Sequence, residues 1–217
     1  MRKVINELRE NPRIQVHADE PGELATEFGD AQSVFRIISD RYDMPLDPSL
    51  QRCFIRFDEF SSHWRFEEDD VTLTGEFRLS YLLAALATPP PPLASKSSSE
   101  FERQLYTEFR VIDDRPGSGT GALSALRLLP GVTVPEIWYH DLRRGVFKMD
   151  INYCEYLDAL TVTKGVSSWQ CLFADISLAG DDFISIASNL KDMLETFPEL
   201  FPEYDYDPLR ERLRERL

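Results

Sequence analysis

The stretch that decides the fold is EIWYHDLRRGVFKMDINYCEYLDAL, residues 136–160. Its first part alternates in steps of two, with Ile137 and Tyr139 on one face of an extended segment and Trp138 and His140 on the other. The tripeptide Arg-Arg-Gly then turns the chain into a second extended run, VFKMDI. This order predicts an antiparallel hairpin.

A helix is expected directly after the hairpin. Asn152 suits the N-cap position, and Glu155, three residues further on, completes a capping box. Lys164 places a favourable charge at the carboxyl end of this helix, and Gly165 supplies a left-handed stop. The expected apolar side consists of Tyr153, Tyr156, Leu157 and Leu160.

Helices are also expected in the first quarter of the chain. Residues 23–42 carry apolar side chains at spacings of three and four, and Gly29 weakens this helix without breaking it. Asp47 as N-cap and Pro48 at the first helical position predict a second helix. The two apolar stripes are Leu24, Phe28, Ala31, Val34, Phe35 and Ile38 in the first helix, and Leu50, Phe54 and Phe57 in the second.

The middle of the chain predicts a strand pair, a short helix and a loop. Residues 62–77 suggest two short strands around an acidic turn, and RLSYLLAALA suggests a helix capped by Ser80. Four prolines and a serine-rich run make residues 88–100 a surface loop. Residues 101–114 are ambiguous, because their apolar spacing suits a helix whereas EFRVI suits a strand.

The carboxyl end of the chain predicts two amphipathic helices. The first runs from Phe183 to Phe197 and is ended by Pro198, and the second begins near Pro208, so residues 181–217 form a C-terminal helical extension. Pairs of strands interleaved with helices favour one α+β domain over residues 1–217. Its sheet should be mostly antiparallel and flanked by helices.

The charge balance limits the kinds of partner. The chain has 38 acidic and 24 basic side chains among 217 residues, a formal net charge of −14. Such a surface repels phosphate backbones and anionic lipids, so neither nucleic acid nor membrane is expected as a partner. The acidic balance either keeps the protein soluble or steers a basic protein partner towards it.

The cysteines and histidines predict no metal, cofactor or disulfide. Cys53, Cys154 and Cys171 match no zinc or redox spacing, and each lies in an apolar run, so we expect three buried free thiols. Three histidines without a ligand spacing predict no metal site. The chain also lacks the apolar run of a signal peptide or a membrane span. These features favour a cytoplasmic location.

One pair of residues offers an enzymatic alternative. Cys154 lies in the first turn of the expected helix, where the helix dipole lowers the pKa of a thiol, and His140 is one hairpin away. This pair would suit a small thiol-dependent hydrolase, whereas the competing interpretation is that Cys154 packs in the core. His140 and Asp141 cannot share a pocket, because neighbours in a regular strand point to opposite faces.

Two loops resemble ligand sites but lack the complete patterns. RPGSGTG, residues 115–121, has the glycines of a phosphate cradle without the lysine and hydroxyl pair of a P-loop, so a mobile loop is expected. The acidic turn EEDD, residues 67–70, lacks the spacing of an EF-hand. We expect it to be a solvated loop or part of a contact surface.

Two segments together resemble the SUKH superfamily, an α+β group that includes bacterial immunity proteins and yeast cell-wall-synthesis regulators. Residues 44–66, MPLDPSLQRCFIRFDEFSSHWRF, are similar to that family's entry into a helix and its first strand. Residues 135–160 are similar to its late hairpin and following helix. The resemblance covers roughly residues 25–170. It implies a non-catalytic protein that binds another protein, in bacteria often a secreted nuclease or other toxin.

The leading hypothesis is therefore a protein-binding domain, either an immunity protein that neutralises a basic toxin or a related scaffold. Aromatic side chains anchor interfaces and exposed carboxylates steer approach. On this ground the candidate partner-binding residues are Trp64, Glu67, Glu68, Asp69, Asp70, Asp113 and Asp114. The alternatives are the thiol-dependent hydrolase and a structural subunit that oligomerises through the C-terminal helices.

Overall fold

A computed structural model describes residues 2–23, 29–57 and 59–217 of the chain. These residues form a single α+β domain around an antiparallel sheet whose seven strands follow one another in chain order. The predicted fold class is therefore confirmed. The strands are β1 (Ile14–Glu20), β2 (Glu59–Glu68), β3 (Val71–Ser80), β4 (Phe109–Asp114), β5 (Leu123–Arg127), β6 (Ile137–Asp141) and β7 (Gly145–Lys148).

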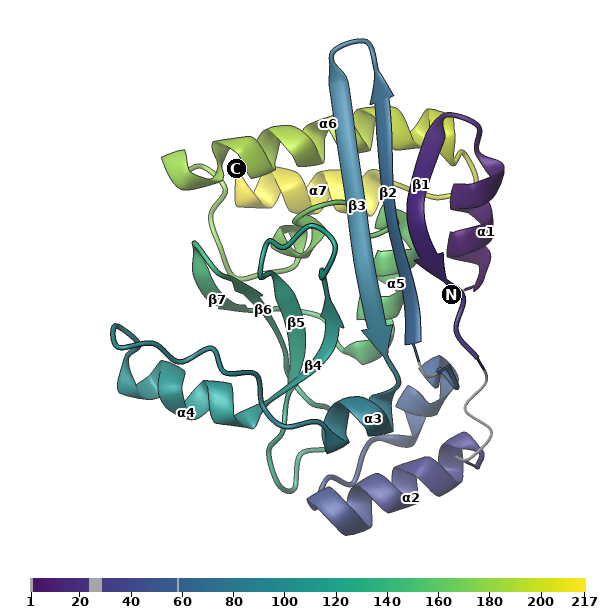
Figure 1. Cartoon of the computed structure of the whole chain (residues 1–217). Coiled ribbons are helices and arrows are strands. Elements are labelled where there is room, and N and C mark those ends of the chain that lie inside the picture. The colour runs from purple at the N-terminus through teal and green to yellow at the C-terminus, as the bar shows by residue number, and fades with distance from the viewer. Residues whose placement is uncertain (1, 24–28, 58) are drawn as a thin grey trace.

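Helices cover one whole face of the sheet and half of the other. The α-helices are α1 (Arg2–Glu10), α2 (Ala31–Tyr42), α3 (Leu82–Ala87), α4 (Glu100–Glu108), α5 (Tyr153–Thr163), α6 (Ile184–Leu200) and α7 (Asp207–Arg216). Short 3-10 helices are η1 (Pro48–Cys53), η2 (Trp169–Leu172) and η3 (Asp181–Phe183). In Figure 1, α5, α6 and α7 lie behind the sheet, whereas α4 lies against β4–β7.

The predicted hairpin and helix of residues 136–160 are both present. Strands β6 and β7 pair in register from Trp138 with Lys148 to Asp141 with Gly145. The Asn152 side chain accepts from the backbone amides of the first turn of α5. The Asn152 amide in turn donates to Glu155 Oε2 at 2.7 Å, which completes the capping box. The apolar side of α5 is buried as expected.

Two predicted helices in the first quarter are shorter than expected. Helix α2 begins at Ala31 with Asp30 as its N-cap, so Gly29 precedes the helix instead of lying within it. The predicted positions Leu24 and Phe28 lie outside the described residues. Asp47 caps its helix as expected, but the helix is the six-residue η1 because the chain becomes extended again at Phe54.

Three further parts of the chain were predicted with a different boundary, left ambiguous or not predicted. Ser80 is still part of β3, so the cap position of α3 is Tyr81. The ambiguous residues 101–114 form a helix and then a strand, because α4 ends at Glu108 and β4 starts at the next residue. Helix α1 and strand β1 were not predicted.

Helix α6 continues through Pro198 instead of ending before it. A proline cannot donate to the carbonyl four residues earlier, which is that of Leu194. The Arg210 guanidinium donates to this carbonyl at 3.0 Å, so α7 supplies the missing hydrogen bond. The apolar sides of α6 and α7 are buried in the main core, so residues 181–217 pack as part of the domain.

The expectation of three free thiols is wrong for two of them. Cys53 at the end of η1 and Cys154 in the first turn of α5 form a disulfide with their Cα atoms 5.3 Å apart. Only the tertiary fold brings these residues together, because they are 101 positions apart in the sequence. Cys171 is a buried free thiol, as predicted. The cytoplasmic location rested partly on free thiols and stays a prediction.

Candidate functional site

The hairpin of β2 and β3 projects from the body of the domain (Figure 1). The two strands pair along their whole length, from Glu59 with Ser80 to Glu68 with Val71. Strand β4 pairs with β3 only at Arg78 and Leu79, near the other end of the hairpin. The tip therefore extends beyond the rest of the sheet, where a partner can reach it from several sides.

The hairpin tip carries the four adjacent acidic side chains predicted for a contact surface. Glu67, Glu68, Asp69 and Asp70 are all exposed. Glu67 pairs with Arg65 at 2.7 Å, and Glu68 pairs with Arg13. Within the described chain neither Asp69 nor Asp70 has an ion pair, so two of the four carboxylates keep their charge unpaired at the tip.

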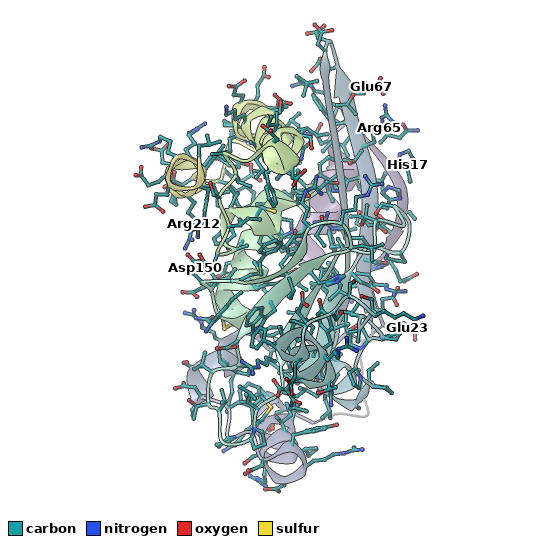
Figure 2. The ribbon with its side chains drawn as sticks, turned by 90° about the vertical axis from the view of Figure 1, so that its left-hand side faces the viewer. His17, Glu23, Arg65, Glu67, Asp150 and Arg212 are labelled. Atoms are coloured by element: carbon teal, nitrogen blue, oxygen red, sulfur yellow. A yellow bond between two sulfur atoms is a disulfide. The ribbon has the colours of Figure 1, made fainter. Side chains whose placement is uncertain are left out.

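The face of β1–β3 that faces away from α6 and α7 is polar and uncovered by any described helix. Figure 2 shows Glu67, Arg65, His17 and Glu23 along this side of the molecule, opposite α6 and α7. The ring centroids of His17 and His63 lie 5.2 Å apart on it. This polar face lies beside the tip.

The glycine-rich loop after β4 is anchored by a carboxylate of the chain itself. The amides of Gly117 and Ser118 donate to the Glu76 carboxylate at 2.5 and 2.7 Å. A Cβ atom at Gly117 would lie 2.9 Å from Glu76 Oε1 and 3.1 Å from His63 Nδ1, so the close approach needs glycine. The predicted mobile loop is therefore held in place, and Glu76 occupies the amides that a phosphate would need.

Trp64 was predicted to anchor a partner, and this prediction is wrong. Its side chain is fully buried, because on β2 it shares the inward face with Phe60 and Phe66. The indole Nε1 donates to the carbonyl of Lys164 at 2.8 Å, and the ring lies against Gly75 so closely that a Cβ there would be 2.3 Å away. Trp64 is a core residue.

Asp113 was also predicted at the surface, and it is 1% exposed. The register of β4 shifts between Val111 and Asp113, and this irregularity leaves Ile112 and Asp113 buried one after the other. Asp114 is half-buried and pairs with Arg78 at 2.5 Å. Neither aspartate is available as a free carboxylate for a partner.

Asp113 belongs to a buried polar network between the sheet and α5. The Tyr156 hydroxyl donates to Asp113 Oδ2 at 2.6 Å and lies 2.9 Å from Ser124 Oγ. Arg115 donates to Gln170 Oε1 at 2.7 Å, and the Gln170 amide approaches the Tyr156 hydroxyl. Burial raises the pKa of Asp113 to about 6, against the lowering effect of the Tyr156 hydrogen bond and the Arg115 charge.

This raised pKa predicts that Asp113 makes the fold more stable in mild acid. Above pH 6 the Asp113 carboxylate is charged in the folded and the unfolded chain, and its burial destabilises the folded state. Between pH 6 and pH 3.8 the folded state binds a proton that the unfolded state does not yet bind, so the free energy of unfolding rises as the pH falls. Relative to Asp113→Asn, the wild type should gain roughly 2 kcal/mol between pH 7 and pH 4. Urea unfolding of both proteins across this range measures it, and parallel profiles would contradict the raised pKa.

The structure does not bring Cys154 and His140 together. Cys154 is in the disulfide and in the core between the sheet and α5. The His140 ring lies on the other face of the sheet against Tyr106, with ring centroids 5.8 Å apart. Burial lowers the pKa of His140. The thiol nucleophile and base of the hydrolase alternative are therefore separated by the sheet.

The described residues contain no metal site and no membrane-spanning helix that would add a further candidate. In residues 2–23, 29–57 and 59–217, no group of three or more His, Cys, Asp or Glu side chains is placed to hold a metal ion. No helix in the same residues is long and apolar enough to cross a membrane.

Comparison with known proteins gives no match to a family model, a curated protein or a solved structure. The resemblance to the SUKH superfamily therefore stays a prediction from two sequence segments.

Proposed function

We propose that this chain is a non-catalytic protein-binding domain whose acidic hairpin tip, residues 67–70, contacts a basic surface of a protein partner. The observation that carries the proposal is the projecting β2–β3 hairpin, whose tip presents four adjacent exposed carboxylates. Asp69 and Asp70 are expected to contribute most to partner binding, because a charge without an internal partner is free to pair with an external one.

The electrostatics of the whole chain support the same kind of partner. The net charge of −14 attracts a basic protein over distances of about one Debye length, roughly 8 Å at physiological salt. The polar face beside the tip, which includes His17 and Arg65, would supply the rest of the contact area (Figure 2). Steering of this kind raises the association rate more than it raises the affinity.

The finer form of the proposal follows the family resemblance. A SUKH-like domain with an acidic contact surface would act as an immunity protein by covering the basic substrate-binding surface of a toxin, or as a scaffold for a basic partner. In both forms the side chains of residues 67–70 hold a macromolecule and take part in no bond-breaking step.

A matched pair of variants tests this function. Asp69→Asn/Asp70→Asn removes two charges at the tip, and asparagine suits the positive φ of 49° at residue 69, so the hairpin is kept. Glu195→Gln/Glu215→Gln removes two exposed charges from α6 and α7 as the control. A basic protein captured from an extract of the source organism should associate about tenfold more slowly with the tip variant than with the control at low salt.

Surface plasmon resonance with the purified captured protein measures these rates at low and high salt. The proposal is contradicted when the tip variant and the control associate equally fast, or when the captured protein is acidic. A second contradiction would be turnover of a small molecule by the purified chain that survives removal of the tip charges.

A further inference from the structure

An open cleft lies beside the N-terminus of α1, away from the acidic hairpin tip. Its volume is about 720 Å³, within the range of small-molecule sites. One wall is the segment from Arg52 to Phe57, the second is α5 at Leu157 and Asp158, and Arg2 of α1 lies at the margin. None of these residues belongs to the contact surface proposed above.

The cleft is cationic in a strongly acidic protein. Arg2, Arg52 and Arg56 line it, and Asp158 is the one carboxylate among its described lining residues. The local balance is therefore positive although the chain as a whole carries a charge of −14. The guanidinium groups of Arg2 and Arg52 come from separate segments of the chain and offer bidentate donors to a carboxylate or a phosphate.

Two of these arginines lack the internal carboxylate partner that other arginines of the chain have. Arg9, Arg78 and Arg127, for example, form ion pairs at 2.5 to 2.6 Å. Among the described residues, no carboxylate lies within ion-pair distance of Arg2 or Arg52. The Arg2 guanidinium instead lies 4.9 Å from the centroid of the Phe57 ring.

The same cleft has an apolar wall. Phe54, Ile55 and Phe57 line it and are only partly buried by the rest of the chain, and Leu157 completes the surface from α5. An apolar wall next to guanidinium groups matches a ligand that has an anionic head and an aromatic or aliphatic body. An inorganic anion would leave this wall exposed to water.

The Cys53–Cys154 disulfide fixes the two walls relative to one another. Cys53 lines the cleft beside Arg52, and Cys154 is one helical turn before Leu157 and Asp158. The covalent bond therefore holds the arginine-bearing segment against α5. A site held in place in this way loses little conformational entropy when a ligand binds.

We propose that this cleft binds a small organic anion, with its carboxylate or phosphate on Arg2 and Arg52 and its apolar body against Phe54 and Leu157. The site is independent of the acidic tip, so the protein can hold a small ligand and a basic protein at the same time.

Calorimetric titration with four probes tests the site. 1-Naphthoate carries a carboxylate and 1-naphthyl phosphate carries a phosphate on the same apolar naphthyl body. Two probes serve as controls: 1-naphthol has the apolar body but is uncharged at neutral pH, and inorganic phosphate has the charge but no apolar body. We expect at least one naphthyl anion to bind ten or more times more tightly than 1-naphthol and inorganic phosphate. The stronger of the two anions identifies the head group. Equal binding of 1-naphthol, or binding of neither naphthyl anion, overturns the proposal.

Arginine variants locate the binding. Arg2→Gln/Arg52→Gln should weaken the preferred anion by tenfold or more, and both side chains are exposed, so the fold is kept. Arg143→Gln/Arg214→Gln removes two exposed charges elsewhere and should leave the affinity within twofold. An equal loss in both double variants would mean that net charge alone attracts the probe, and this result overturns the assigned site.

Discussion

The unfolding free energy is expected to fall by about 4 kcal/mol when the Cys53–Cys154 disulfide is removed. The bond closes a loop of 101 residues, and a cross-link over about 100 residues removes chain entropy worth roughly 4 to 5 kcal/mol from the unfolded state. It also joins η1 to α5, two elements that no strand pairing connects. The loss should therefore include local loosening of residues 48–57.

Urea unfolding in the presence and absence of dithiothreitol measures this effect. The wild type should lose stability in the reductant, whereas Cys53→Ala/Cys154→Ala should be destabilised from the start and should not respond to it. Cys171 is a free buried thiol, so it offers the reductant no bond to cleave. A wild type whose unfolding midpoint is the same in both buffers would show that the bond does not stabilise the fold.

A second large loss, about 4 kcal/mol, is expected for Lys164→Met. The Lys164 side chain is fully buried and its Nζ donates to Glu7 Oε2 at 2.6 Å and to the Thr161 carbonyl at 2.7 Å. The ammonium group also lies 4.0 Å from the centroid of the Tyr204 ring. It connects α5 with α1 and the segment between α6 and α7, so its removal takes away the buried counter-ion of Glu7 and weakens three elements at once.

The partner of Lys164 is an ionised carboxylate. Burial alone would raise the pKa of Glu7, but hydrogen bonds, led by the one from Lys164, outweigh burial and lower this pKa to about 2. Lys3→Met is the matched control, because Lys3 pairs with the same Glu7 at 3.2 Å but is 62% exposed. We expect the control to cost less than 1 kcal/mol.

Chemical unfolding of Lys164→Met, Lys3→Met and the double variant Lys164→Met/Glu7→Gln separates two contributions to the loss of stability. One is the lost contacts of Lys164, and the other is the charge that remains on Glu7. The double variant should recover part of the loss, because Glu7→Gln removes the charge that has lost its buried counter-ion in Lys164→Met. Equal stability of the Lys164 and Lys3 variants would contradict a buried ion pair at this position.

Much of the local structure could be predicted from residues that are close together in the sequence. The Asn152 capping box and the β6–β7 turn depend on residues within four positions of one another. The acidic turn at residues 67–70 was placed at the surface because four adjacent carboxylates cannot be buried without partners. The sequence therefore identified the hairpin tip that the proposed function uses.

Burial at single positions was harder to predict than the elements themselves. Trp64 is an aromatic residue near an acidic turn, and such a residue suits an interface. On β2, however, Trp64 lies on the face that packs into the core. Asp113 and Asp114 form an acidic dipeptide typical of a surface, but the register shift in β4 turns Asp113 inward. Neither the inward face nor the shift can be known until the neighbouring strands are placed.

The arginine-lined cleft was missed for a related reason. Arg52 and Arg56 flank Cys53 in the run RCFIRF, a pattern that suggested only a helix stripe and its polar side. Arg2 is 50 positions away from Arg52, and Leu157 is more distant still. No local pattern joins these three segments.

By itself, the sequence determined the fold class, the β6–β7 turn, the Asp47 and Asn152 caps and the exposed acidic tip, because each depends on residues that are neighbours along the chain. The tertiary structure alone decided the Cys53–Cys154 bond, the burial of Trp64 and Asp113, the Lys164–Glu7 pair and the arginine-lined cleft. These features depend on which distant segments come into contact, and that outcome is set by packing of the whole core, in which each side chain is constrained by neighbours from several elements.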